Sequence, residues 1–224
     1  MAQSRARVVT ETFAYDGGRQ VTLYIPPVPP EAIVFAADGE WHASRLVAAL
    51  EAAHAPTTMV VGVHGLTDDE GRFKEYVPAV DPQRFAAHER FFVDDVRGWV
   101  RSAFGVALPS SRTAVWGASL GGELALALGL RHPDVYGVAF SASPGGGYRP
   151  PATWPSPLPR VYLVAGTQEP FFLENAKRWA DALRDAKADV ILGERAGAHG
   201  GAFWSEEFPL MVEWAFKGEL ANGP

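Results

Sequence analysis

The residues best suited to covalent chemistry lie in the segment WGASLGG at residues 116–122, which contains the pattern G-x-S-x-G. In this pattern a serine sits on a strained turn between a strand and a helix, and the flanking glycines let neighbouring backbone approach closely. The N–H groups at the start of the helix then point at the oxygen that becomes negative during acyl transfer. Ser119 is therefore the predicted nucleophile. The alternative is a glycine-rich helix start with Ser119 as its N-cap.

A serine hydroxyl is a weak nucleophile until a base removes its proton, and the chain has six histidines for that role. His199 lies in a glycine-rich segment, GAHGG at residues 197–201, after the last predicted strand. It also follows Ser119 in chain order, as the base does where this motif is used. His64 follows a strand as well, but it precedes the serine. His199 is the predicted general base, and the alternative is an exposed loop histidine.

The third member of such a site orients the imidazole and stabilises its charged form. It is expected in the loop GTQEP at residues 166–170, between Ser119 and His199, which gives Glu169. Two alternatives stay open: Glu174 could reach the histidine from the following helix, and Glu169 could instead cap that helix from its first turn.

Two backbone N–H donors are needed to hold the oxyanion. One is expected from Leu120, directly after the nucleophile. The other is expected from the loop DGEW at residues 38–41, through Gly39 or Glu40. The alternative is an ordinary Asp-Gly turn.

The elements that must position these residues follow from hydrophobic spacing. Strands are predicted at 7–14, 20–26, 32–37, 57–63, 112–118, 135–141, 160–165 and 189–194. Helices are predicted at 43–53, 88–104, 119–130, 171–186 and 202–216. Two opening strands followed by repeated strand–helix units indicate an α/β fold, with a mostly parallel eight-stranded sheet and helices on both faces. The length of 224 residues fits a single domain over 1–224.

One region, 144–159, is rich in glycine and proline and too long for an ordinary connection, so it is a candidate for shaping a binding site. The pocket walls are expected from Trp41, Tyr148, Trp154 and Phe171, although each aromatic could equally be a core residue. An aromatic-lined pocket would suit small or aryl esters.

The net charge of −6, without basic clusters, argues against nucleic acid and anionic membranes as partners. The absence of cysteine excludes disulfides, thiolate zinc sites and a cysteine nucleophile. The sequence shows no signal peptide and no membrane span, so the expected compartment is the cytoplasm. The expected chemistry needs no metal and no organic cofactor, and nothing in the sequence fixes the oligomeric state.

Several motifs together resemble the esterase D-like branch of the α/β-hydrolases, which includes the enterochelin (ferric siderophore) esterases. The turn at 38–41 resembles the family's D-G-x-x-W turn, and RFKEYVP at 72–78 is similar to its R-x-x-E-Y-x-P segment. H-P-D at 132–134 and S-x-S at 141–143 match the surroundings of the nucleophile. The resemblance covers most of the chain from about residue 33 onward. It implies an α/β-hydrolase fold with Ser119 as nucleophile, Glu169 as acid and His199 as base.

Two departures from the family bear on the substrate. The resemblance is to the shorter single-domain members, so the extra N-terminal domain of full-length enterochelin esterases is not expected. It also lacks a basic patch for a triply charged ferric catecholate, although Arg72, Arg84 and Arg149 could gather locally. Arg72 and Glu75 are expected to form a structural ion pair under the floor of the site.

The expected function is that of a serine carboxylic-ester hydrolase working through an acyl-enzyme on a small-molecule ester. The alternatives are a siderophore trilactone hydrolase, an acyltransferase of the same fold, and a catalytically idle binding or scaffold domain.

Overall fold

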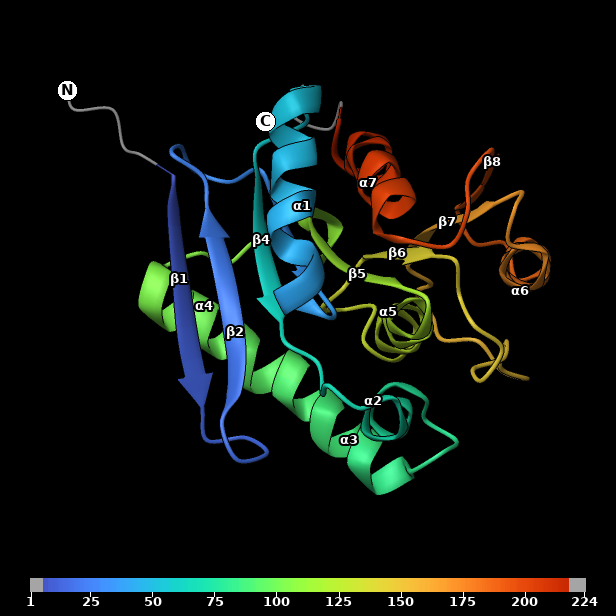
Figure 1. The fold of residues 1–224 in the computed structure, drawn as a ribbon, viewed down its shortest axis with the longest axis horizontal. Helices are drawn as coiled ribbons and strands as arrows, with labels where there is room; N and C mark the ends of the chain where they lie inside the picture. Colours follow the sequence, from blue (N-terminus) through green and yellow to red (C-terminus); the bar gives the residue numbers. More distant parts are fainter. Residues whose placement is uncertain (1–5, 218–224) are drawn as a thin grey trace.

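The computed structural model describes residues 6–217, and its centre is an eight-stranded sheet in the order β1-β2-β4-β3-β5-β6-β7-β8 (Figure 1). Strands β1 and β2 pair antiparallel, as do β2 and β4, and every later pairing from β4 to β8 is parallel. The predicted mostly parallel α/β sheet is thereby confirmed. The strands are β1 (Arg7–Phe13), β2 (Arg19–Ile25), β3 (Ala32–Ala36), β4 (Thr58–Val63), β5 (Thr113–Ala118), β6 (Val138–Ala142), β7 (Arg160–Gly166) and β8 (Val190–Arg195).

The central strands are buried along their whole length because helices cover both faces of the sheet. All residues of β3, β4, β5 and β6 are buried. Side chains alternate between the two faces: Ile33 and Phe35 of β3 join one hydrophobic cluster, whereas Val34 joins the other. Continuous apolar runs of this kind are what a parallel strand covered on both sides requires.

The helices divide between the two faces of the sheet. Leu46 of α1 and Phe208 and Met211 of α7 belong to one core cluster, and Leu124 of α5 and Trp179 of α6 belong to the other. In Figure 1, α1 and α7 lie side by side over the sheet. The helices are α1 (Gly39–Ala53), α2 (Asp69–Tyr76), α3 (Pro82–Arg90), α4 (Arg97–Phe104), α5 (Leu120–Arg131), α6 (Pro170–Asp185) and α7 (Gly201–Phe216), with a π-helical turn (Phe91–Val96) between α3 and α4 and a short 3-10 turn (Ser110–Arg112) before β5.

The helices differ from the prediction in three main places. Helix α1 starts at Gly39 rather than at residue 43, so the expected loop after β3 is the first turn of a helix. The helix expected at 88–104 begins earlier, where the Asp81 side chain accepts a hydrogen bond from the Arg84 N–H at 3.0 Å and caps α3. Helix α2 was not predicted. Its sequence is mostly polar, its last two residues, Glu75 and Tyr76, are buried, and Asp68 caps it through the Gly71 N–H at 2.6 Å.

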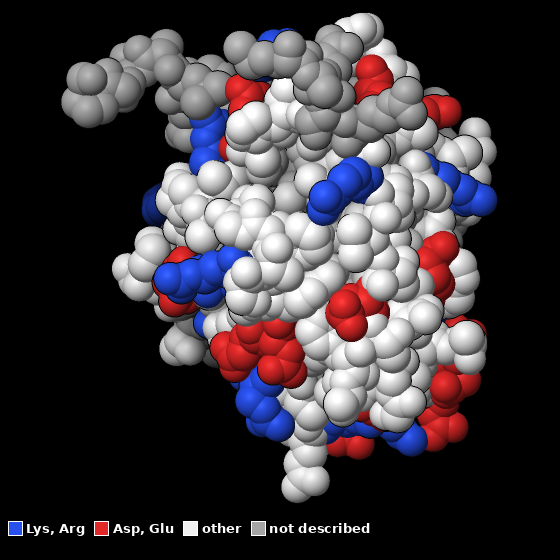
Figure 2. Space-filling model, turned by 90° about the vertical axis from the view of Figure 1, so that its left-hand side faces the viewer, with Lys and Arg blue, Asp and Glu red and all other residues white. Residues whose placement is uncertain are grey.

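On the face of the molecule shown in Figure 2, basic and acidic side chains occur in small interspersed groups, so neither sign of charge dominates that face. Between residues 6 and 217, none of the helices combines the length and the apolar character that a membrane crossing needs.

Candidate active site

Ser119 occupies a sharp turn between β5 and α5. Its φ of 56° and ψ of −120° lie outside the regions that non-glycine residues ordinarily adopt. A Cβ on Gly117 would overlap the carbonyl of Gly121, so this turn closes only with glycine at residue 117. The Ser119 N–H donates to the Ala142 carbonyl at 2.9 Å. In the described chain the Ser119 side chain makes no capping hydrogen bond to α5, which leaves its hydroxyl available for other contacts.

His199 lies between Ser119 and Glu169. Its Nε2 is 3.1 Å from Ser119 Oγ, and its Nδ1 is 2.5 Å from Glu169 Oε2. The ring stacks on Phe172 at 3.8 Å between centroids, and Trp204 meets it edge-on at 4.8 Å. A neutral imidazole that donates from Nδ1 to the carboxylate has a free lone pair on Nε2, which can accept the serine proton. The arrangement can therefore raise the nucleophilicity of the Ser119 hydroxyl.

Glu169 is buried and held by two further hydrogen bonds. Its Oε1 accepts from the Gly166 N–H and from Ser143 Oγ, each at 2.6 Å. The Ser143 hydroxyl in turn accepts from Trp204 Nε1 at 2.8 Å. Glu174, the other acid considered, pairs with Arg178 on the surface at 3.0 Å. Of the two acids, the structure brings Glu169 against His199.

Three residues of this cluster were not among the predicted site residues. Ser143 and Trp204 support Glu169, and Phe172 forms one wall for the imidazole. Ser143 stands in the S-x-S motif noted in the sequence and has a positive φ of 47°, so the motif was a usable signal. Trp204 and Phe172 had no such signal, because their contacts arise only when distant segments meet.

The proposed oxyanion donors are first-turn residues of two helices. Leu120 begins α5, and Gly39 and Glu40 begin α1. The first N–H groups of a helix have no partner within the helix, so they can face a ligand. Gly39 packs so tightly that a Cβ there would overlap the backbone of Gly62 in β4. The Glu40 carboxylate accepts from the Gly65 N–H at 3.0 Å, and burial raises the pKa of Glu40 above its usual range.

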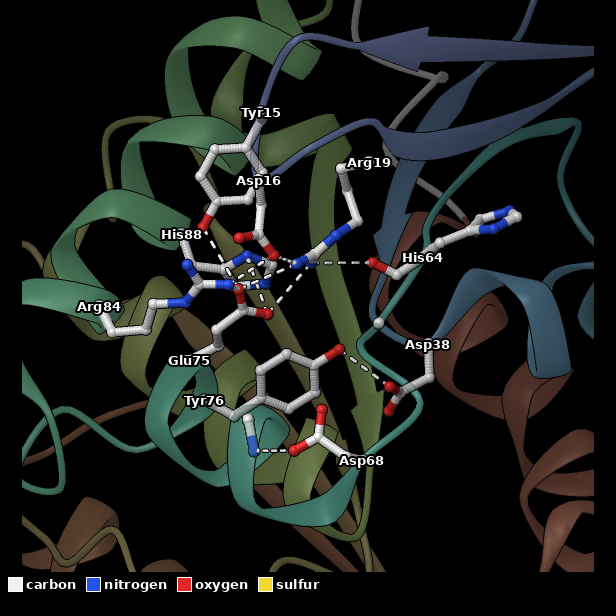
Figure 3. A network of polar contacts seen from close by, with 12 residues as sticks. Tyr15, Asp16, Arg19, Asp38, His64, Asp68, Glu75, Tyr76, Arg84 and His88 are labelled. Carbon is white, nitrogen blue, oxygen red and sulfur yellow. Dashed lines mark hydrogen bonds and ion pairs between the residues drawn. The ribbon is translucent and has the colours of Figure 1, made fainter.

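His64, the second candidate base, contacts Thr22 instead of the serine. Its Nε2 lies 2.9 Å from Thr22 Oγ1, and in Figure 3 its ring points away from Asp38. Burial lowers the pKa of His64.

The four aromatic residues predicted to line a pocket fall into two groups. Trp41 and Phe171 are 44% and 58% exposed. Tyr148 and Trp154 are half-buried and pack against Trp179 of α6, with ring centroids 5.2 and 6.5 Å away. Only the first two present open aromatic surface.

The segment 144–159 contains no helix or strand, and a buried carboxylate orders its first part. Glu123 of α5 accepts a hydrogen bond from the Tyr148 N–H. Burial raises the pKa of Glu123, and the backbone donors of Gly147 and Tyr148 counter this in part. The glycine segment 145–147 is thereby fixed between Phe171 on one side and Phe73 on the other.

The expected ion pair between Arg72 and Glu75 is wrong. Arg72 pairs with Asp38 at 2.8 Å. Glu75 instead pairs with Arg19 at 2.9 Å and with Arg84 at 2.7 Å (Figure 3). Arg72 and Glu75 lie three residues apart on α2, but Arg72 reaches the carboxylate in the turn before α1, whereas Glu75 is buried against the guanidinium groups of β2 and α3.

The family model Esterase, described as "Putative esterase", matches residues 16–215. No curated protein matches the chain.

Among solved structures, an enterobactin esterase from Shigella flexneri is similar, with a TM-score of 0.75 and 18% identity over 92% of this chain and 58% of that one. A ferulic acid esterase from Anaeromyces mucronatus has a TM-score of 0.72 and 12% identity over 96% of both chains. An S-formylglutathione hydrolase from Staphylococcus aureus has a TM-score of 0.70 and 12% identity over 97% of this chain and 99% of that one.

These likenesses establish an α/β-hydrolase fold, and the chain spans little more than half the length of the enterobactin esterases. Because the family model covers nearly all described residues, this chain belongs to the esterase family, and the serine, histidine and carboxylate that meet at the elbow lie within the matched residues.

Proposed function

We propose that the chain hydrolyses esters through a covalent acyl-enzyme, with Ser119 as nucleophile, His199 as general base and Glu169 as the acid that orients it. One observation carries the proposal: the His199 ring contacts Ser119 Oγ with one nitrogen and the Glu169 carboxylate with the other. The strained elbow at Ser119 supports it, because a backbone in that conformation persists only where its surroundings hold it in place.

The reaction begins when Ser119 Oγ attacks the ester carbonyl carbon while His199 Nε2 takes the hydroxyl proton. The resulting oxyanion is held by the amide of Leu120 and by that of Gly39 or Glu40. The bond to the alcohol then breaks as His199 returns the proton to the leaving oxygen, and Ser119 stays acylated. Water, deprotonated by the same imidazole, attacks the acyl-enzyme and releases the acid.

The substrates that fit this site best are small or aryl esters. Trp41 and Phe171 offer exposed aromatic surface, and Phe172 lies directly against the histidine. Aromatic faces of this kind bind aryl groups by stacking. Proteins of similar fold include a ferulic acid esterase, which supports an aromatic acyl group.

A second candidate, a siderophore trilactone hydrolase, is favoured by the likeness to the enterobactin esterases. Charge weighs against it. The guanidinium groups of Arg72 and Arg84 are already paired with carboxylates. Arg149 contacts the Asn175 side chain at 3.3 Å and is the remaining arginine of the three considered. A triply anionic complex would thus meet little uncompensated positive charge.

The test is a panel of nitrophenyl, feruloyl and trilactone esters run on the wild type and on Ser119→Ala, His199→Ala and Glu169→Gln. The first two variants are expected to lose most of a roughly 10⁶-fold rate enhancement, and Glu169→Gln less, as in comparable triads. Faster turnover of the trilactone than of the aryl esters would favour the second candidate. Product formation that rises with added alcohol would indicate acyl transfer.

Labelling with a fluorophosphonate probe separates an enzyme from an idle scaffold. We expect the probe to label the wild type and not to label Ser119→Ala, which lacks the nucleophile. A folded wild type that takes no label and hydrolyses no ester would overturn the proposal.

A further inference from the structure

The turn between β3 and α1 holds a buried carboxylate. Asp38 is 1% exposed and has a left-handed φ of 53°. Asparagine and aspartate adopt this conformation more readily than other non-glycine residues, but it still needs support from the surroundings. The next two residues, Gly39 and Glu40, carry the amides proposed to hold the oxyanion. The conformation of Asp38 therefore sets where those amides point.

Two side chains from α2 hold the Asp38 carboxylate. Tyr76 donates its hydroxyl to Oδ1 at 2.8 Å. Arg72 donates from Nε to Oδ1 at 3.1 Å and from Nη2 to Oδ2 at 2.8 Å. This two-pronged contact fixes the plane of the carboxylate as well as its distance. Figure 3 shows the Tyr76 hydroxyl pointing at the Asp38 carboxylate.

The carboxylate also separates the two helix starts. A Cβ on Gly65 would lie 2.5 Å from Asp38 Oδ1, and a Cβ on Gly121 would lie 3.1 Å from Oδ2. Gly121 belongs to the first turn of α5, directly after Leu120. Asp38 thus fills the space between the helix that carries Leu120 and the helix that carries Gly39 and Glu40.

The charge of Asp38 needs compensation at this position. A buried carboxylate beside a developing oxyanion would oppose the negative charge of the transition state. The Arg72 guanidinium, 14% exposed, neutralises it, and the Tyr76 hydroxyl adds a second donor. Burial and the nearby Asp38 charge raise the pKa of Tyr76 well above its usual range, so the hydroxyl stays a proton donor at neutral pH.

Helix α2 is itself anchored from its other side. Glu75, directly before Tyr76, is fully buried and pairs with Arg19 of β2 and Arg84 of α3. The Tyr76 ring stacks on His88 at 5.4 Å. These contacts hold α2 in place, so Arg72 and Tyr76 bind Asp38 from a helix whose position is fixed.

We propose that Tyr76 and Arg72 are positioning residues for the oxyanion site: they hold Asp38 so that the first-turn amide of α1 faces the carbonyl attacked by Ser119. This rests on the proposed function. Neither side chain touches the reacting atoms in this scheme. Both act through Asp38.

The test compares an aryl ester with its thiono analogue, in which sulfur replaces the carbonyl oxygen. Sulfur accepts hydrogen bonds weakly, so a thiono ester gains little from the oxyanion donors. Removing an oxyanion donor outright costs about 10²–10³-fold in kcat. Tyr76 only positions such a donor, so Tyr76→Phe is expected to lower kcat on the oxo ester by a smaller factor, about tenfold. Its KM is expected to stay within about twofold, and the kcat ratio of oxo to thiono ester should fall.

Two further variants and two controls accompany Tyr76→Phe. Arg72→Met is expected to lower the kcat ratio of oxo to thiono ester. Arg72→Lys is expected to lower it less, because lysine keeps the positive charge but loses the two-pronged contact of the guanidinium with the Asp38 carboxylate. Tyr136→Phe removes the hydroxyl of another buried tyrosine, 3.4 Å from the Phe92 carbonyl, and should leave the ratio unchanged. Asp69→Asn removes the exposed partner of Arg72 and should also leave it unchanged.

The outcomes separate this inference from the proposed function. A Tyr76→Phe enzyme that matches Tyr136→Phe in kcat and in ratio overturns the positioning role, as does an equal loss on both esters. If Tyr76→Phe melts well below the wild type, the test passes to Arg72, whose side chain is partly exposed. The kcat ratio of oxo to thiono ester for Arg72→Met and Arg72→Lys then decides whether the positioning role holds. A wild type that hydrolyses neither ester, or a Ser119→Ala variant that keeps the activity, instead overturns the proposed function.

Discussion

The Glu169 carboxylate has little freedom to move. It is 5% exposed and accepts from the Gly166 N–H, from Ser143 Oγ and from His199. Hydrogen bonds to a charged group are shorter and stronger than neutral ones. A carboxylate fixed in this way fixes the imidazole too, because the ring turns only if its Nδ1 contact breaks.

Substituting Ser143 tests this support. Ser143→Ala removes one donor to Glu169 and the acceptor of Trp204 Nε1. We expect kcat to fall about tenfold with little change in KM, since a hydrogen bond to a charged group contributes roughly 1.5–3 kcal/mol.

The matched control is Ser141→Ala, a buried serine whose hydroxyl reaches the Gly122 carbonyl at 2.9 Å and not Glu169. Steady-state kinetics on one aryl ester compares the two variants. Equal losses would contradict a specific role for Ser143.

For single residues, the sequence predicts those members of the site that residue type and chain order can identify. Ser119, Glu169 and His199 were chosen from a motif, a loop and their order, and the structure brings all three into contact. Trp204 lies 61 residues from Ser143, so their hydrogen bond depends on how the sheet and α7 meet. No local pattern carries that information.

Among the secondary-structure elements, the β5–α5 junction brings backbone together most closely at a described glycine. Here the strand reverses into a helix within one residue, and Gly117 and Gly121 touch across the turn. The close approach leaves no room for a side chain at residue 117.

Gly117→Ala is expected to reduce both stability and activity. Its Cβ would overlap the Gly121 carbonyl, so the turn must open, at a cost of about 1–3 kcal/mol from overpacking. Circular dichroism melts and ester turnover would measure the two effects.

Gly98→Ala provides the opposite case. Among the described residues, no atom lies within 4 Å of a Cβ at this position in α4. Alanine should therefore raise the free energy of unfolding by about 0.5–1 kcal/mol through its higher helix propensity. If Gly117→Ala were as stable as Gly98→Ala, the tight elbow would be refuted.

The strands and the long apolar helices were predictable because burial gives them a clear period. The strand and helix pattern of the sheet layers was confirmed, whereas α2 escaped because its sequence, DEGRFKEY, has no apolar stripe. The early start of α3 did leave a signal. Asp81 followed by Pro82 is typical of an N-cap and first helical residue, but the apolar spacing used for this helix begins only at residue 88.

Across the whole molecule, a partly buried cluster of charges joins the β1–β2 hairpin to the helices beneath it. Asp16, Arg19, Glu75 and Arg84 pair with one another, and His88 lies among them, fully buried. Within residues 6–217 neither ring nitrogen of His88 has a hydrogen-bond partner. Burial, and secondarily the positive charges of Arg19 and Arg84, lower the pKa of His88 well below its usual range.

This lowered pKa makes stability depend on pH. In the unfolded chain a histidine gains its proton below about pH 6.5, whereas native His88 resists protonation. The unfolded state then binds more protons, so the free energy of unfolding falls as pH falls. His88→Phe is expected to lose less stability than the wild type between about pH 7 and about pH 5, measured by urea unfolding at each pH.

The control is Phe92→Leu, which disturbs packing beside His88 at 5.1 Å without removing a titrating group. It should lower stability at every pH and keep the wild-type slope. A His88→Phe protein with the wild-type slope would show that native His88 does not resist protonation.

The serine and its proposed base are 80 residues apart along the chain, and that separation has a temporal consequence. During synthesis the elbow can form while the segment bearing His199 has not yet been made. The proposed catalytic group is complete only when the segment before α7 reaches the elbow and α7 docks, with its last-turn carbonyls bound by Arg112 at 2.7 Å and Arg160 at 2.9 Å. A chain that lacks or releases this last segment presents Ser119 without the ring that is proposed to activate it.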